Sequence, residues 1–139
     1  MKIIGLDNKE YSWRFTKYNR QREDCSLLHL RARKILYDLF PFDIIYEEVV
    51  LPGIYTEINI KSLIADFYIH RPRLMIEVQG EQHYNFNRFF YGNKLEYFRA
   101  RKLDTLKKKW CQINNITLIE LPYNETDEQW RKKICQKEN

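Results

Sequence analysis

The chain has 139 residues, of which 44% are hydrophobic and 15% aromatic, a composition that fits one folded domain and excludes a disordered chain. Its 24 Lys and Arg residues exceed its 19 Asp and Glu residues, and the resulting net charge of +5 favours a polyanionic partner. No apolar run reaches the roughly 18 residues of a membrane helix. No signal peptide is readable and the odd number of cysteines lacks a CxxC pair, so we expect an intracellular protein without membrane contact.

The first 25 residues mix aromatic rings with basic side chains. Rings can stack on bases and cations can meet phosphates, so this segment is a candidate DNA-contacting arm. The candidate DNA-contacting residues of this segment are Arg14, Lys17 and Arg20. The same pattern fits equally well a segment packed on the domain. We therefore divide the chain into an N-terminal extension, 1–25, and a main domain, 26–139.

Hydrophobic periodicity and turn residues predict the elements of the main domain. In chain order they are a helix over 26–40, strands over 44–51, 63–69 and 74–79, a long helix over 93–114, a strand over 116–121 and a helix over 127–136. Ser26 is the expected N-cap of the first helix. The order predicts a single-domain α/β fold in which helices flank a mixed β-sheet.

Two carboxylates face each other in the predicted hairpin. A turn centred between Arg71 and Pro72 places Asp66 directly opposite Glu77. Strict alternation then puts the residues around these two acids on the same face, namely Ile64, Asp66, Tyr68, Met75, Glu77 and Gln79. The opposite face is expected to be wholly apolar and to lie against a helix, with Ala65, Phe67, Ile69, Leu74, Ile76 and Val78.

Like charges on opposed residues of an antiparallel pair are destabilising, so something must offset the repulsion between Asp66 and Glu77. A divalent cation does so, because Mg²⁺ prefers one or two carboxylates together with water and phosphate oxygens. The alternative is that one acid points into solvent or meets an arginine. Gln79 shares the face of Glu77 and can hold water or a phosphate oxygen. His83 follows at the rim, where it can transfer a proton or hold a phosphate.

The long helix carries Asp104 within a strongly basic stretch. Its basic side chains Arg99, Lys102, Lys107 and Lys108 are candidates for contacts with DNA phosphates. In that interpretation Asp104 or a lysine reaches the metal site. The alternative is a solvated helix face with local pairs, such as Asp104 with Lys107.

The chain resembles the PD-(D/E)XK nuclease superfamily in an ordered set of motifs. These are DFYI, MIEVQGEQHY, Asp104, Lys107 and NNITLIELPY. Its very-short-patch-repair-like branch, with its small free-standing phage homing endonucleases, is the most similar. The resemblance implies a restriction-endonuclease-like core with Asp66 and Glu77 as metal-site acids. It also implies catalytic roles for Gln79, His83 and Asp104.

Two departures from that family stand out. Gln79 occupies the position of the superfamily's lysine, so that lysine is absent or is supplied by Lys102 or Lys107. His29 stands on the first helix where relatives often have a glutamate, and Glu23 is a weak substitute.

The resulting expectation is a Mg²⁺-dependent DNA endonuclease of homing type, with Mn²⁺ as a second usable metal. Cutting both strands with one active site would require a homodimer or successive nicks. One alternative is a nuclease for mismatched or branched DNA. The other is a DNA-binding protein that keeps the fold but has lost catalysis.

Overall fold

The computed structural model describes residues 1–19, 21–54, 63–81 and 94–138. In chain order, its elements are β1 (Lys2–Ile4), β2 (Glu10–Ser12), η1 (Phe15–Lys17), α1 (Leu27–Leu39), β3 (Ile45–Leu51), β4 (Leu63–Ile69), β5 (Leu74–Gln79), α3 (Lys94–Ile113), β6 (Thr117–Pro122) and α4 (Asp127–Glu138). Every predicted helix and strand is present, with its ends within two residues of the prediction. The short elements β1, β2 and η1 were not predicted.

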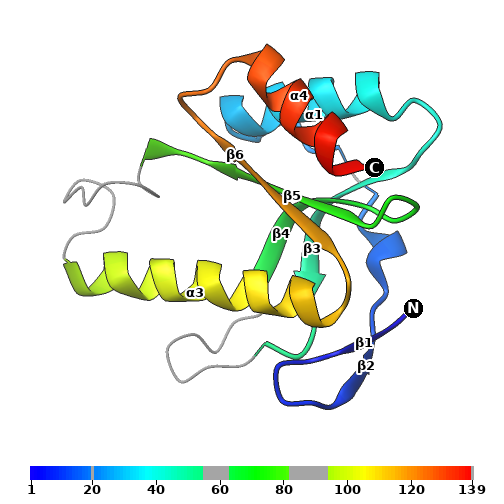
Figure 1. The fold of residues 1–139 in the computed structure, drawn as a ribbon, viewed down its shortest axis with the longest axis vertical. Helices are drawn as coiled ribbons and strands as arrows, with labels where there is room; N and C mark the ends of the chain where they lie inside the picture. The colour runs from blue at the N-terminus through cyan, green and yellow to red at the C-terminus, as the bar shows by residue number, and fades with distance from the viewer. Residues whose placement is uncertain (20, 55–62, 82–93, 139) are drawn as a thin grey trace.

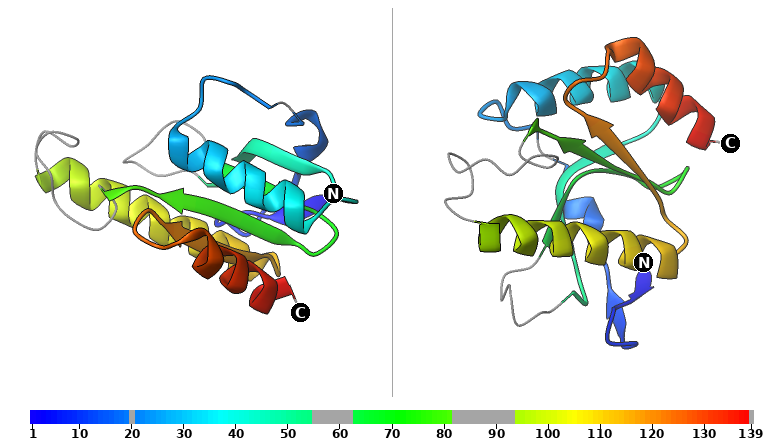
Figure 2. Two further views of the ribbon diagram at one scale, coloured as in Figure 1. Left: turned by 90° about the horizontal axis from the view of Figure 1, so that it is seen from above. Right: turned by 60° about the vertical axis from the view of Figure 1, so that its left-hand side comes forward.

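The main sheet has the order β3-β4-β5-β6. β3, β4 and β5 are antiparallel neighbours, whereas β6 lies parallel to β5. Helices α1 and α4 cover one face of this sheet, and α3 crosses the other (Figure 1; Figure 2). The prediction of a mixed sheet flanked by helices in an α/β domain is therefore confirmed.

The sheet separates two apolar cores. The core under α1 and α4 includes Leu36 and Trp130, and the core under α3 includes Trp110. The N-terminal segment belongs to this second core, because Trp13 is only 2% exposed and its ring lies 5.1 Å from that of Trp110. Phe15 is buried beside it. These two rings are thus part of the fold and cannot stack on a nucleic-acid base.

The ends of the helices follow from local chemistry. The Ser26 side chain accepts a hydrogen bond of 3.1 Å from the backbone N–H of His29, as an N-cap does. At the end of α3, the buried Asn114 side chain accepts from the N–H of Ile4 at 2.8 Å and donates to its carbonyl at 2.9 Å. Asn114 thereby ties β1 to the main domain.

The predicted hairpin register is confirmed over three pairs, Phe67–Ile76, Tyr68–Met75 and Ile69–Leu74. One residue further on, the two strands are joined through side chains. The Asp66 N–H donates to Glu77 Oε2 at 3.0 Å, and the Val78 N–H donates to Asp66 Oδ2 at 2.9 Å. At the point where the strands separate, each of the two carboxylates thus accepts a hydrogen bond from a backbone N–H of the other strand.

The predicted alternation of faces is wrong on one side of Asp66. Ala65 packs in the core under α3 with Tyr68, and not with Phe67 under α1. The ladder between β3 and β4 is interrupted here, because it passes from the pair Glu47–Phe67 to the pair Val49–Ala65. Between them Glu48 has a φ of 52°, a left-handed value that is uncommon for a non-glycine residue. At this point the alternation of side chains between the two faces of the sheet changes on β3 and β4 together.

Candidate active site

A hollow of about 190 Å³ opens between the sheet and α3 at the point where β4 and β5 separate. Its lining residues are Asp66, Glu77, Val78, Gln79, Asp104, Lys107, Leu118 and Glu120. Four of the five residues predicted to be catalytic are therefore brought together here. The fifth, His83, lies outside the described residues, as does Arg20 of the predicted DNA-contacting set.

Lys107 reaches the acids from α3. Its ammonium donates to Glu77 Oε1 and, at 2.7 Å, to the backbone carbonyl of Ile64. The side chains of Lys107 and Glu77 are only 15% and 11% exposed, so water screens this ion pair weakly. Of the two lysines considered as substitutes for the lysine missing after Glu77, Lys107 is thus the one in contact with Glu77. Lys102 lies exposed on the same helix.

The charges in this hollow are not balanced. Burial, together with the neighbouring Glu77 carboxylate, raises the pKa of Asp66 well above its ordinary value, while Lys107 opposes the rise. Burial and the same glutamate also raise the pKa of the Cys111 thiol to about 12. The ammonium of Lys107 therefore does not offset the effect of burial and of the Glu77 carboxylate on Asp66.

Glu120 is a residue of the hollow that sequence analysis missed. It lies on β6 directly beside Glu77, in the parallel register that pairs the two residues. Its carboxylate accepts from the Gln79 amide and forms an ion pair with Lys108 at 3.0 Å. The prediction of the strand over 116–121 placed Glu120 in the sheet, but nothing in the sequence indicated that this strand would pair with β5.

The donor set suits a hard cation. Within the described ranges, no three His, Cys, Asp or Glu side chains converge into a closed metal cage. Mg²⁺ does not need one, because it is commonly held by one or two carboxylates and keeps several waters. The close pair of Asp66 and Glu77 fits that requirement.

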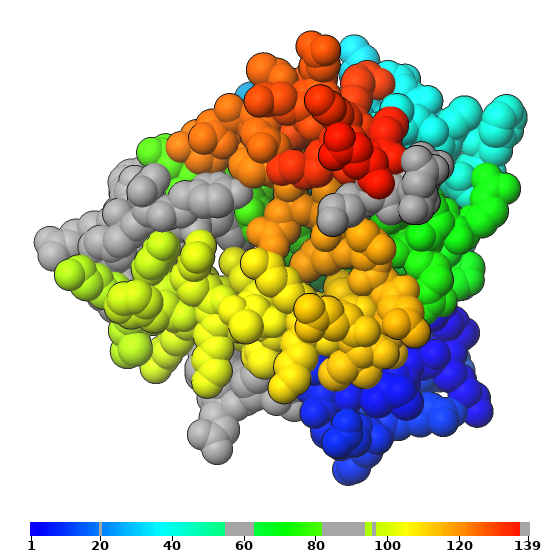
Figure 3. All heavy atoms as spheres, viewed as in Figure 1, coloured from blue at the N-terminus to red at the C-terminus, as the bar shows by residue number. Residues whose placement is uncertain are grey.

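The predicted DNA-contacting residues fall into two groups. Lys102 and Lys108 lie exposed on α3 beside the hollow, and Arg99 is exposed further along the same helix. Arg14 and Lys17 lie in the N-terminal segment, where they border a separate depression near Val50. Figure 3 shows α3 as a ridge across one face of the molecule, with β6 and α4 above it and the N-terminal hairpin below.

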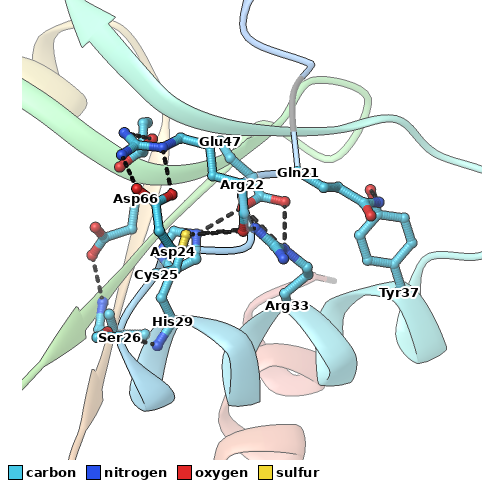
Figure 4. Close-up of polar contacts among 12 residues, drawn as sticks. Gln21, Arg22, Asp24, Cys25, Ser26, His29, Arg33, Tyr37, Glu47 and Asp66 are labelled. Carbon is cyan, nitrogen blue, oxygen red and sulfur yellow. Dashed lines mark hydrogen bonds and ion pairs between the residues drawn. The ribbon is translucent and has the colours of Figure 1, made fainter.

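A second ionic cluster lies at the start of α1, and Figure 4 shows it near Asp66 of β4. Glu47 of β3 is 4% exposed; it contacts His29 Nε2 at 2.7 Å and accepts from the Arg33 guanidinium at 2.7 Å and 2.9 Å. Burial alone would raise the pKa of Glu47, but the bonds from His29 and Arg33 outweigh it and lower the pKa. The ring of His29 also stacks on Phe67, at 4.3 Å.

Comparison with known proteins finds relatives among viral proteins. The chain is 39% identical over 66 residues to uncharacterized protein 307L of Invertebrate iridescent virus 6. This match covers 48% of this chain and 34% of that protein. It is 44% identical over 50 residues to uncharacterized protein 033L of Invertebrate iridescent virus 3, covering 36% and 26%. It is 31% identical over 83 residues to uncharacterized protein 094L of Frog virus 3, covering 59% and 54%.

The matched segments thus span between about a quarter and about half of these viral proteins. Their names state no activity. No family model matches the chain, and no solved structure matches it. Among the described residues, no helix is long and apolar enough to cross a membrane.

Proposed function

We propose that this protein is a metal-dependent DNA endonuclease that hydrolyses phosphodiester bonds in the hollow between β4, β5 and α3. One observation carries the proposal: Asp66, Glu77 and Lys107 meet in one hollow although they come from two strands and a distant helix. Two carboxylates can hold a divalent cation, and an ammonium can stabilise the negative charge that develops on a phosphate during hydrolysis. The net charge of +5 supports a polyanionic substrate.

Asp66 and Glu77 would hold Mg²⁺ or Mn²⁺, which supplies positive charge to the scissile phosphate and makes water more acidic. Lys107 is positioned to donate to the phosphate oxygens as negative charge accumulates on them during attack by water. Gln79, which is 6% exposed and bonded to Glu120, can orient a water or a phosphate oxygen. Asp104 adds a further acceptor from α3.

The contact between Lys107 and Glu77 weakens the case for a non-catalytic DNA-binding protein. That alternative was motivated by the absence of a lysine after Glu77, and Lys107 supplies one from another element. The resemblance to homing endonucleases and the viral relatives support an enzyme encoded by a virus. Whether its substrate is a plain duplex, a mismatch or a junction is decided by experiment.

The test is cleavage of supercoiled plasmid, mismatched duplex and four-way junction DNA with Mg²⁺, Mn²⁺ or EDTA. We expect metal-dependent cutting that is lost in Asp66→Asn and in Glu77→Gln, both of which preserve side-chain shape. Lys109→Ala, on the exposed surface of α3, is the matched control and should cut normally. Discrete plasmid fragments would favour homing, and cutting of the junction or mismatch alone would favour repair or recombination. Retained DNA binding without any cutting would refute the proposal.

A further inference from the structure

A second hollow of about 370 Å³ adjoins the first and shares three of its lining residues, Gln79, Asp104 and Glu120. Its outer wall has a different character. That wall is formed by α3 and carries the cations Arg101, Lys102 and Lys108. The two hollows therefore form a continuous surface that runs from the acidic site to a basic one.

The basic wall follows from the helical repeat. Arg101 and Lys108 are seven residues apart, so they project from the same face of α3 about 10 Å apart along its axis. Asp104, which lies between them, points toward the wall shared by the two hollows. A polyanionic chain leaving the acidic site along α3 thus meets positive charge as soon as it passes Asp104 and Glu120.

The size of the second hollow and the exposure of its ion pair both suit a nucleotide. Its volume falls in the range of roughly 300–1,000 Å³ that accepts a whole small molecule, which is more than a single ion needs. The ion pair between Lys108 and Glu120 has side chains that are 55% and 29% exposed. Such exposed pairs contribute little stability, so Lys108 can exchange the carboxylate for a phosphate at small cost.

We propose that this second hollow binds the nucleotide next to the scissile phosphate on the cleaved DNA strand, with Arg101 and Lys108 contacting its backbone. The inference rests on the proposed function, because it takes the acidic hollow as the place of cleavage. In this proposal Arg101 is a DNA-binding residue. Lys108 and Lys107 have different roles, because Lys108 contacts the DNA backbone and Lys107 acts on the reacting phosphate. Glu120 holds Lys108 at the wall until DNA arrives.

The first test measures binding of a short fluorescent duplex in EDTA, where no cleavage can occur, over a series of salt concentrations. Each phosphate contact contributes about 0.9 to the slope of log affinity against log salt. The double variant Arg101→Ala/Lys108→Ala should lose about two contacts. The control Lys34→Ala/Lys109→Ala removes two exposed charges outside the hollow and should change the slope by less than half as much. Equal losses in the two double variants would overturn the proposal.

The second test locates the contact on the DNA. Single phosphates around the mapped cleavage position are replaced by neutral methylphosphonates, and affinity is measured for wild type and Lys108→Ala. We expect the substitution next to the cleaved bond to weaken wild type several-fold and to leave Lys108→Ala nearly unchanged. Equal weakening of both proteins at every position would refute the assignment. A protein that cuts no DNA but shows the slope change would refute the proposed function and leave a DNA-binding hollow.

Discussion

Two ionic clusters meet this sheet, one at the start of α1 and one beside α3, and their charges are arranged differently. At the start of α1, Glu47 is held by both His29 and Arg33, and these bonds lower its pKa. Beside α3, Lys107 contacts Glu77, and the pKa of the neighbouring Asp66 is raised by burial and by Glu77. A buried carboxylate with enough cationic partners stabilises the fold. In the pair of Asp66 and Glu77, the ammonium of Lys107 does not outweigh burial and the neighbouring carboxylate, so the pKa of Asp66 stays raised.

The largest effect on stability is expected in the balanced cluster. Glu47→Ala leaves the buried His29 and the partly buried Arg33 without their carboxylate, which should lower the free energy of unfolding by about 3–5 kcal/mol. Thermal unfolding followed by circular dichroism should show a drop in Tm on the order of 10 °C. The control Asp38→Ala breaks the exposed ion pair with Arg131 and should leave Tm nearly unchanged. Similar small changes in both variants would mean that the cluster does not stabilise the fold.

The unbalanced cluster should instead show its largest effect on catalysis. Lys107→Met keeps the apolar stem but removes the ammonium that contacts Glu77, and kcat should fall by about 10²–10³-fold. Lys109→Met is the control on the same helix. Single-turnover cleavage at saturating DNA isolates the chemical step. If only KM rises while kcat is unchanged, Lys107 binds the substrate and does not act in the reaction.

The smallest expected effect is on the pH dependence of stability, where a carboxyl with a raised pKa and one with a lowered pKa act in opposite directions. The raised pKa of Asp66 means that the folded state binds more protons than the unfolded state above the ordinary value of 3.8, so stability falls as pH rises through this window. Asp66→Asn removes this loss of stability and should raise Tm at neutral pH in EDTA. The increase in Tm should become smaller as the pH is lowered. The carboxyl of Asp24, whose pKa Arg22 lowers, provides the control of opposite sign.

In that control, Asp24→Asn should leave Tm unchanged or lower it slightly at neutral pH, because its carboxylate is stabilised in the folded state above its lowered pKa. A lower Tm in Asp66→Asn would contradict the imbalance inferred for the acidic hollow. The contrast between the two clusters would then have to be abandoned.

Several features of this protein were determined by the local sequence. Apolar periodicity and capping residues gave the ends of the long elements, as Ser26 shows at the start of α1. The turn at Arg71 and Pro72 set the hairpin register, and with it the proximity of Asp66 and Glu77. These features depend on neighbours along the chain, which is why a sequence pattern suffices to predict them.

Other features were decided only by the tertiary structure. The contact of Lys107 with Glu77 depends on how α3 is rotated against the sheet, and buried Trp110 and partly buried Leu103 set that rotation by packing in the core. The position of Glu120 beside Glu77 depends on β6 joining β5 in parallel. Such contacts join residues far apart in the chain, so no local periodicity records them. The sequence thus determined which acids face each other, and the packing of α3 decided which lysine meets them.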